Sequence, residues 1–379
     1  MKKVKLDDLV TVMNEREDNP SQSKYDRFVG LEHYDSGSVS ITRWGSTEML
    51  VSAMKVFHRG DILVARRNVY LKRASSVDFD GITSGDSIIL HVNDEQYKDI
   101  VPFVLNTDSF WDYADQHSDG SMSKRLAPKT MLEYEFTLPD DGEVERLSTL
   151  LWSMERTKTA YKNLIAKTEE LVKSQFVEMF GDPITNPNGY DQHKLIELAT
   201  KITDGVHKKP VYTETGKPFI SVTNINHGVI DFTDCKYVSE EAYQTMIKTT
   251  FPEKGDVLYT KVGATYGIPA YIDTDEPFGL YVSVCLIKPK HEMIDARFLT
   301  ESMRMEYVKK QADDRIKGIG VPDLHLQEIK EFQILCPPRY LQEQFVALVE
   351  QSDKSKFAAQ QALADLTATQ KALMRQYLG

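Results

Sequence analysis

One short string near the end of the chain has the residue types of a nuclease metal site. Pro322-Asp323 is followed by Glu328-Ile329-Lys330, and two carboxylates beside a lysine could hold a magnesium ion next to an attacking water. The two carboxylates are unusually close in sequence, and the corresponding segment of the repeat described below, Lys124 to Leu132, has no such string. We therefore expect no nuclease activity from these residues.

A second string, Asn186-Pro187-Asn188-Gly189-Tyr190, is similar to the Asn-Pro-Pro-aromatic site in which amino-methyltransferases hold their target amine. Here the second proline is missing and a glycine interrupts the string. The chain has no convincing Gly-x-Gly cofactor loop, and Val262 to Gly267 lacks the Gly-Lys-Ser/Thr ending of a phosphate loop. Because Asn-Gly pairs favour tight turns, we interpret this string as a turn between two elements.

The numbers and spacing of cysteine and histidine do not indicate a metal site or redox chemistry. The three cysteines, Cys235, Cys285 and Cys336, are odd in number and far apart, and the nine histidines show no paired ligand spacing. We expect neither a metal site nor a disulfide framework, and we expect no cofactor in this chain.

Length and charge limit the class of protein further. A chain of 379 residues is long enough for two or more domains. The net charge of −11 argues against a protein that grips nucleic acid by bulk positive charge, although it does not exclude a local basic groove. No stretch approaches the roughly 20 apolar residues of a membrane span, so we expect a cytoplasmic protein.

The sequence also contains an internal repeat. In the second part of each copy, matching residues are 198 positions apart. Nearer the start of each copy the offset is shorter, as loop insertions would produce, and a duplication of this kind divides the chain near residue 185. The matches include Ala114-Asp115 with Ala312-Asp313, Glu133 with Glu331, Pro139 with Pro337, Gly60-Asp61-Ile62-Leu63 with Gly255-Asp256-Val257-Leu258, and Phe28-Val29 with Phe219-Ile220.

Each copy ends in a segment with the pattern of a long helix. Residues 143–180 contain no proline or glycine, and apolar residues recur at alternating steps of four and three, with a lysine at the same seam position in both copies, Lys158 and Lys356. Helices of about 37 residues would be about 55 Å long. Neither seam is apolar enough to stand alone in water, so we expect the helices to pack on each other. The expected packing residues are Leu147, Leu151, Met154, Tyr161, Ile165, Val172, Phe345, Val349, Leu363, Leu366 and Leu373.

The segment before each helix reads as a mixed domain. Short β-type runs, such as Asp61 to Ala65 and Leu280 to Ile287, are bounded by glycine, proline and asparagine turns. We predict an α+β fold in which two globular domains alternate with two long helices that pair as an antiparallel coiled coil. The predicted boundaries are 1–139 for the first globular domain, 140–182 for the first helix, 183–336 for the second globular domain and 337–379 for the second helix.

The start of the second helix carries a resemblance to a known family. The run Leu335-Cys-Pro-Pro-Arg-Tyr-Leu-Gln-Glu-Gln-Phe-Val-Ala-Leu-Val349 resembles the proline-proline, then Glu-Gln, start of the second long helix in specificity subunits of Type I restriction-modification enzymes. Residues 203–207, 217–225 and 254–264 are also similar to that family, and 171–183 looks like the close of its first spacer helix. The first globular half is similar more loosely, through Arg59 to Asn68.

The resemblance implies a noncatalytic, prokaryotic DNA-recognition subunit. Each globular domain would be a target-recognition domain that reads one half of a split, asymmetric DNA sequence, and the helices would set the spacing and dock two methyltransferase subunits. Catalysis would belong to those partners and to the restriction and translocase subunits, which would carry S-adenosylmethionine, ATP and magnesium.

Residues that read DNA are expected among polar and basic loop positions, because arginine and lysine pair with guanine edges and asparagine with adenine. We selected residues that flank glycine-rich turns between strand-like runs. The candidates are Arg66, Arg67, Asn68, Tyr70 and Lys72 in the first domain, and His207, Lys208, Lys209, Tyr212, Thr223, Asn224, Lys261, Thr265 and Tyr266 in the second.

A hypothesis from a different class also fits a duplicated, two-headed chain. In it, the two globular domains grip other proteins and never DNA, so that the chain is a protein-binding scaffold. Sequence-dependent retention of DNA by the chain with its methyltransferase partner would separate the two hypotheses, because only a DNA-recognition subunit requires it.

Overall fold

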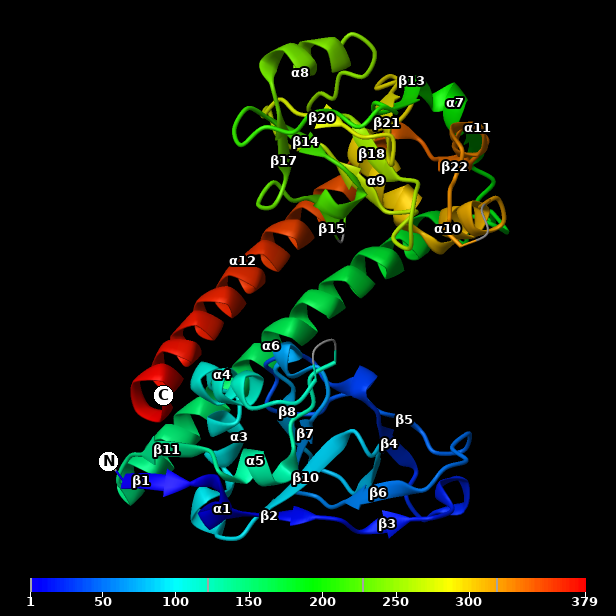
Figure 1. The fold of residues 1–379 in the computed structure, drawn as a ribbon. Helices are drawn as coiled ribbons and strands as arrows, with labels where there is room; N and C mark the ends of the chain where they lie inside the picture. Colours follow the sequence, from blue (N-terminus) through cyan, green and yellow to red (C-terminus); the bar gives the residue numbers. More distant parts are fainter. Residues whose placement is uncertain (1, 121–122, 227, 318–319) are drawn as a thin grey trace. The chain divides into compact units, whose positions relative to one another are not determined.

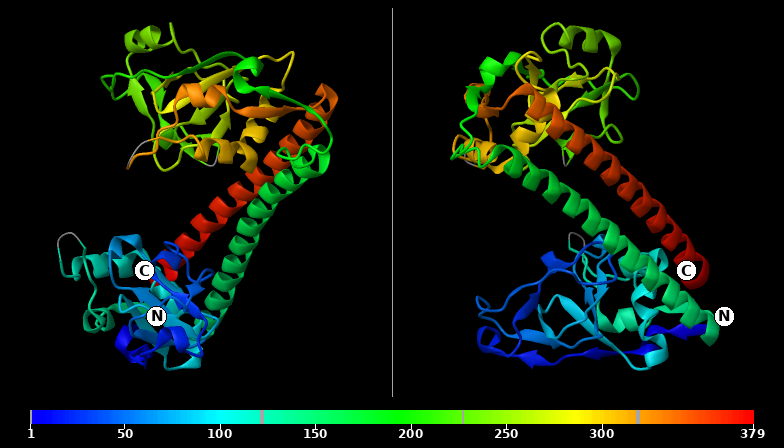
Figure 2. Two further views of the ribbon diagram at one scale, coloured as in Figure 1. Left: turned by 90° about the vertical axis from the view of Figure 1, so that its right-hand side faces the viewer. Right: turned by 180° about the vertical axis from the view of Figure 1, so that it is seen from behind.

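The computed structural model describes residues 2–120, 123–226, 228–317 and 320–379, and the chain divides into two compact units. Unit 1 comprises Met1–Ile165 and Ala358–Gly379, and unit 2 comprises Ala166–Phe357. Both ends of the chain therefore belong to unit 1 (Figure 2). Each unit holds one globular head and a portion of each long helix, and we call the heads the first head (residues 2–138) and the second head (residues 191–336).

A four-stranded antiparallel sheet forms the centre of the first head, in the order β2-β10-β7-β8 (Figure 1). Its strand β7 is apolar at every position because both faces of the sheet are covered. Ile62 and Val64 face one core cluster, whereas Leu63 and Ala65 face another, as the alternation of side chains along a strand requires. The bounds are β2 (Val10–Met13), β7 (Ile62–Ala65), β8 (Ala74–Ser76) and β10 (Ser87–Val92).

Two further sheets complete the first head. One has the order β3-β6-β9-β4-β5 and contains a parallel pair, β4 with β9, and the other pairs β1 with β11. Short helices cover the central sheet. The bounds are β1 (Lys2–Lys5), β3 (Arg16–Glu17), β4 (Arg27–Val29), β5 (Gly45–Ser46), β6 (Met54–Phe57), β9 (Gly81–Thr83), β11 (Glu135–Leu138), α1 (Leu6–Leu9), α2 (Glu95–Lys98), α3 (Val101–Val104), α4 (Asp108–Gln116) and α5 (Pro128–Leu132), with 3₁₀ turns η1 (Pro20–Gln22), η2 (Leu31–His33) and η3 (Val69–Leu71).

The second head repeats this plan. Its central sheet has the order β13-β21-β18-β19, a parallel pair joins β14 to β20, and β12 pairs with β22. The bounds are β12 (Asp191–Lys194), β13 (Ala199–Asp204), β14 (Lys217–Ile220), β15 (Ile225–Asn226), β16 (Val229–Ile230), β17 (Lys236–Val238), β18 (Val257–Thr260), β19 (Pro269–Tyr271), β20 (Gly279–Leu280), β21 (Val284–Pro289), β22 (Gln333–Cys336), α7 (Leu195–Leu198), α8 (Glu240–Met246), α9 (Ala296–Arg304), α10 (Glu306–Asp313) and α11 (Leu326–Lys330), with the 3₁₀ turn η4 (Val222–Asn224).

The matching sheet orders confirm the internal duplication and the α+β class. The β-type run from Leu280 to Ile287 is not one strand, however. Leu280 ends β20, which pairs with β14, whereas β21 begins at Val284 in the central sheet. The chain changes sheets between them, which a continuous apolar run cannot reveal because both strands are buried.

The two long helices have the same length at the same offset. Helix α6 (Asp141–Phe180) and helix α12 (Arg339–Leu378) each contain 40 residues. In unit 1, Leu151 near the start of α6 shares a core cluster with Leu378 at the end of α12. In unit 2, Phe176 near the end of α6 contacts Phe345 near the start of α12, with ring centroids 5.5 Å apart. The helices are therefore paired antiparallel in each unit, as the sequence predicts.

Burial of the expected seam residues differs along the helices. The most buried ones join the core of a head as well as the opposite helix, because they fall in the two large clusters that also contain sheet residues. Buried positions are Leu147, Leu151, Met154, Val172, Phe345 and Val349, and half-buried positions are Tyr161, Ile165, Leu363, Leu366 and Leu373.

A lysine lies within the helix pair of each unit. In unit 1 the ammonium of Lys158 donates to Gln370 Oε1 at 2.8 Å and pairs with Glu155. In unit 2, Lys356 pairs with Glu169 of the opposite helix. A buried charge with a specific partner favours one register of two helices over shifted ones. No helix in the described residues is long and apolar enough to cross a membrane.

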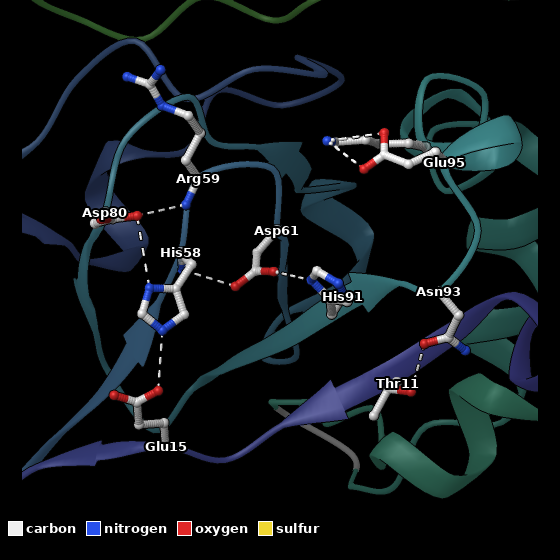
Figure 3. A network of polar contacts seen from close by, with 10 residues as sticks. Thr11, Glu15, His58, Arg59, Asp61, Asp80, His91, Asn93 and Glu95 are labelled. Atoms are coloured by element: carbon white, nitrogen blue, oxygen red, sulfur yellow. Dashed lines mark hydrogen bonds and ion pairs between the residues drawn. The ribbon is translucent and has the colours of Figure 1, made fainter.

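A buried aspartate fixes the turn before the central strand of each head. In the first head, Asp61 accepts the peptide N–H of His58 at 2.8 Å and lies 3.0 Å from Nδ1 of His91 (Figure 3). In the second head, Asp256 accepts the peptide N–H of Glu253 at 2.8 Å and the ammonium of Lys288 at 2.7 Å. Burial raises the pKa of Asp256, in spite of its contact with Lys288. The repeated Gly-Asp pair thus stabilises the turn before β7 and before β18.

Candidate nucleic-acid interface

The loop between β13 and β14 presents basic side chains to solvent in the second head. His207, Lys208 and Lys209 are exposed, and the ring of His207 lies 3.2 Å from a carboxylate oxygen of Asp204. Val211, farther along the loop, is 85% exposed. An exposed basic loop held at both ends by strands is a common way to contact a phosphate backbone.

Tyr212 anchors this loop. Its ring is half-buried against Phe219 of β14, with centroids 6.0 Å apart. The ammonium groups of Lys209 and Lys236 lie 5.6 and 5.0 Å from the ring centroid. The ring therefore gathers two positive charges at one place, as cation–π contacts do. Lys236 was not among the sequence candidates, because it comes from β17 and reaches the loop only in the fold.

The turn η4 uses its asparagine to hold itself. Asn224 is buried, and its Oδ1 accepts the peptide N–H of Ser221 at 3.0 Å. Its Nδ2 donates to the carbonyl of Asp231 at 3.4 Å. Thr223 is exposed and exchanges a hydrogen bond with the Ser221 hydroxyl at 2.9 Å. Of these two candidates, Thr223 is the one whose side chain faces solvent, whereas the amide of Asn224 is occupied.

The turn after β18 contains Lys261, Thr265 and Tyr266. The exposed Thr265 accepts the hydroxyl of Thr260 through its backbone carbonyl. The hydroxyl of Tyr266 donates to Asp313 at 2.6 Å, and the ammonium of Lys309 lies 4.3 Å from its ring centroid. Hydrogen bonds from Lys309 and Tyr266 lower the pKa of Asp313.

Lys261 is buried rather than exposed. Only 8% of its side chain is accessible, and its ammonium lies 3.5 Å from Asp204 and 3.7 Å from Asp323. Asp323 is 44% exposed, so this cluster presents a carboxylate, backed by a lysine, at the surface. Lys261, which the sequence predicts as a DNA contact, instead forms an ion pair with the partly exposed Asp323.

The turn after β7 places the candidates of the first head. Asn68 and Lys72 have left-handed backbones, with φ of 55° and 47°, at the two ends of η3. Asn68 Oδ1 accepts the hydroxyl of Ser123, and Lys72 pairs with Asp108 at 2.7 Å. Tyr70, between them, is exposed.

Two arginines share one carboxylate beside that turn. Arg67 Nη1 lies 3.3 Å from one oxygen of Asp86, and Arg125 Nη2 lies 3.4 Å from the other. Both arginines are about half-exposed. Arg66 is half-buried, and no hydrogen-bond partner for its Nε is found among the described residues. The guanidinium donors left over are available to acceptors on a ligand.

Comparison with known proteins finds similarity to one family. A family model described as "Type I restriction modification DNA specificity domain" matches residues 187–366. The Type I restriction enzyme MjaIX specificity subunit of Methanocaldococcus jannaschii is 21% identical over 353 residues, which cover 84% of this chain and 77% of the relative. Residues 187–366, just under half of this chain, therefore match the type I restriction-modification DNA specificity domain, and a specificity subunit is similar over most of the chain.

Solved structures of type I systems share the fold of this chain. The S subunit of the type I system from M. genitalium has a TM-score of 0.59 at 14% identity, with 100% of this chain and 96% of that chain covered. A chain from a structure on assembly and conformational transition of the type I system has a TM-score of 0.52 at 18% identity, with 99% and 97% covered. The resemblance inferred from the proline-proline, Glu-Gln run is confirmed.

Residues of the two strings with catalytic residue types contact other residues of unit 2. Asp323 lies near Lys261, and Glu328 pairs with Lys317 at 2.7 Å. The described residues contain no group of three or more histidine, cysteine, aspartate or glutamate side chains able to hold a metal. In the other string, both side-chain amide atoms of Asn186 hydrogen-bond the backbone of Tyr190, which closes a turn.

Arg125 and Asp86 are the polar residues that the sequence argument missed in the first head. Asp86 follows Gly85 in a turn but is acidic, and Arg125 lies five residues after Gly120; the two come from segments far apart in the chain. The internal repeat could have identified Arg125, because the 198-residue offset aligns it with Asp323. A position that changes from arginine to aspartate within one duplicated scaffold is a candidate for specificity.

Proposed function

We propose that this chain is a type I specificity subunit that reads a bipartite, asymmetric DNA target, one half-site with each head, and itself has no catalytic activity. The observation that carries the proposal is the duplicated sheet order, β2-β10-β7-β8 and β13-β21-β18-β19, combined with unlike side chains at corresponding turns. Equivalent scaffolds would present themselves to DNA in equivalent ways, and unlike side chains would select different base pairs.

The exposed basic loop of the second head and the paired arginines of the first head support DNA as the ligand. Lys208 and Lys209 provide charge for phosphates, and Arg67 and Arg125 provide forked donors suited to guanine. The net charge of −11 is compatible with this assignment if partner subunits supply much of the nonspecific grip on phosphates.

We further propose that helices α6 and α12 set the distance between half-sites and dock two methyltransferase subunits. The pairing of these helices, with a lysine fixing the register in each unit, would make a stiff spacer. S-adenosylmethionine, ATP and magnesium would be bound by the methyltransferase and the restriction and translocase subunits, because the chemistry of base methylation and DNA translocation would belong to them.

Methylation mapping tests the function directly. Cells that express this chain with its methyltransferase partner would be compared, by single-molecule sequencing, with cells that express the methyltransferase alone. We expect a split, asymmetric motif only when both are present. Absence of the motif, with both proteins soluble and co-purifying, would favour the protein-binding scaffold, and gel retention of sequence-matched and scrambled DNA by the complex would check that result.

An insertion tests the spacer. Four residues, about 6 Å of helix, would be inserted after Thr168 in α6 and, at the same level, after Lys356 in α12, so that Lys356 and Glu169 stay together. We expect the gap between the methylated half-sites to change while both half-sites persist. The control places the same four residues after the exposed Asp275. An unchanged gap in the helix variant would contradict the spacer role.

A further inference from the structure

The turn after β7 is held by a particular set of backbone contacts in the first head. Arg125 forms bridges with both Arg67 and Asp119. The peptide N–H of Leu126 donates to the carbonyl of Arg66 at 2.8 Å. Two segments that are distant in sequence are thereby fixed beside each other, so the side chains of Arg67 and Arg125 project from a rigid support.

The turn after β18 has the same contacts in the second head. Asp323 forms bridges with both Val262 and Lys317, and the peptide N–H of Leu324 donates to the carbonyl of Lys261 at 2.8 Å. Asp323 therefore occupies the place of Arg125, and Lys261 occupies the place of Arg66.

The left-handed positions coincide as well. Asn68 and Lys72 correspond to Gly263 and Gly267, which have φ of 87° and 88°. The peptide N–H of Asn68 donates to the carbonyl of Lys124, as that of Gly263 donates to the carbonyl of Pro322. The duplication has kept this backbone in detail, even where a left-handed conformation is strained for a residue other than glycine.

The charge at the position shared by Arg125 and Asp323 is opposite in the two heads, whereas Arg66 and Lys261 are both cationic. In the first head, two guanidinium groups surround the single carboxylate of Asp86, whereas in the second head the single ammonium of Lys261 lies between the carboxylates of Asp204 and Asp323. Two polar atoms at these turns are buried without a hydrogen bond among the described residues: Nε of Arg66, the neighbour of Arg67, and Oδ1 of Asp323. A fixed backbone with inverted charge indicates a position whose side chain was changed for binding rather than for folding.

From this equivalence we infer that Arg125 and Asp323 are corresponding base-reading residues, one in each head. Asp86 positions Arg125 together with Arg67, and Arg125 donates hydrogen bonds to the acceptor atoms of a guanine. Asp323, positioned by Lys261, accepts a hydrogen bond from the amino group of a cytosine. The inference rests on the proposed function, which it deepens by assigning a base chemistry to each half-site.

The chemistry of the two clusters suits these roles. Arginine has five N–H donors in a fixed fork, and the contact with Asp86 orients the guanidinium while leaving donors for the O6 and N7 atoms of guanine. A carboxylate close to DNA is repelled by phosphates unless a cation lies near it. The ammonium of Lys261, 3.7 Å behind Asp323, provides that cation without itself reaching the surface.

The test uses the assembled complex with its methyltransferase. Once the wild-type motif has been mapped, Arg125→Gln, Arg125→Lys and Asp323→Asn are mapped in the same way, and binding is measured for DNAs that differ at single base pairs. We expect Arg125→Gln and Arg125→Lys each to reduce discrimination at one guanine of one half-site on the order of 10- to 100-fold. Asp323→Asn should do so at one cytosine of the other half-site.

Two control variants share the charge of the tested residues. Arg59→Gln removes an exposed arginine of the first head whose side chain points away from the polar network around Asp61 (Figure 3), and Asp275→Asn removes a 90% exposed carboxylate of the second head. We expect both controls to keep the wild-type motif. Thermal unfolding of every variant establishes that altered reading does not come from an unfolded head.

The outcomes separate the inference from the proposed function. If the wild type yields a split motif and folded Arg125→Gln and Asp323→Asn variants retain it unchanged, the inference is wrong and the proposed function stands. Full discrimination by Arg125→Lys would also overturn it, because a phosphate contact tolerates lysine and a forked contact does not. A wild-type complex without any motif would overturn both.

Discussion

The two heads of the chain share their backbone and differ in their charges. The bridges around Arg125 recur around Asp323, and the left-handed Asn68 recurs as Gly263. Positions that determine the backbone have kept their geometry since the duplication, whereas the exposed side chains on it have diverged. One chain thus provides its own control, because a substitution can be compared with its counterpart in the other head.

The largest effect is expected from breaking one unit and sparing the other. Leu151 is fully buried in the core of unit 1, and its counterpart at the 198-residue offset, Val349, is 3% exposed in unit 2. Because each change buries an unpaired charge, Leu151→Asp and Val349→Asp should each destabilise their own unit by about 4 kcal/mol or more. Hydrogen exchange resolved by segment measures this.

The neighbour of Leu151 provides the matched control. Leu150 is 47% exposed, so Leu150→Asp should leave the exchange of unit 1 close to that of the wild type. Half-buried Leu363, farther along the same seam, should give an intermediate loss as Leu363→Asp. Normal protection of unit 1 in the Leu151→Asp variant would refute the assignment of this residue to a shared core.

A smaller effect is expected at the aspartates that fix the turns before β7 and β18. In Asp256→Asn the ammonium of Lys288, only 19% exposed, loses the buried one of its two carboxylate partners and keeps Glu253, whereas in Asp61→Asn the partner is the 58% exposed ring of His91. We expect losses of about 2–3 kcal/mol for the first and about 1 kcal/mol for the second. Denaturant unfolding measures the loss of stability in both variants. A larger loss in Asp61→Asn than in Asp256→Asn would contradict the prediction.

Removing charge from the exposed loop of the second head should weaken DNA binding. The double variant Lys208→Ala with Lys209→Ala should lower the affinity of the complex for its target and reduce the slope of log affinity against log salt by about 1–2, because each phosphate contact contributes ~0.9. Lys254→Ala, in the same head but outside this loop, is the control. An unchanged salt slope in the double variant would remove both lysines from the interface.

The smallest effect is a pH dependence confined to unit 2. Glu301 is buried in α9, where burial raises its pKa above the usual 4.5, and its counterpart at the 198-residue offset is the apolar Phe103. The stabilisation from protonated Glu301 is complete below pH 4.5 and is lost as the pH rises through the raised pKa.

Glu301→Gln, which stays neutral, should therefore gain stability relative to the wild type as the pH rises from 5 to 8. We expect a difference of about 2–4 °C in the unfolding midpoint of unit 2, corresponding to ~1 kcal/mol. Unit 1 should show no such difference between the two proteins. A constant offset across this pH range would show that Glu301 does not titrate there.

Much of the fold could be predicted because its signals are periodic. The 198-residue offset relates Asp141 and Phe180, the ends of α6, to Arg339 and Leu378, the ends of α12. The run Asp61 to Ala65 predicts β7 (Ile62–Ala65) to within one residue. Periodicity could not show that Leu151 packs against a head as well as a helix, since burial against a head depends on segments distant in sequence.

The candidate site was less accessible to sequence reasoning. Lys261 has the residue type and turn position of a DNA contact, yet Asp204 and Asp323 from two other segments draw it into the interior. Asn224 likewise holds its own turn. The predicted assignments of individual residues to bases stay predictions, because base contacts depend on the docking geometry of the complex.

The antiparallel pairing of α6 and α12 has a consequence for synthesis of the chain. Helix α6 is complete at Phe180, but α12 begins only at Arg339. A ribosome adding 5–20 residues per second needs about 8–30 s to cover that interval. During this time the seam of α6 has no partner helix, so the nascent first half exposes apolar surface to chaperones and proteases until the second half emerges.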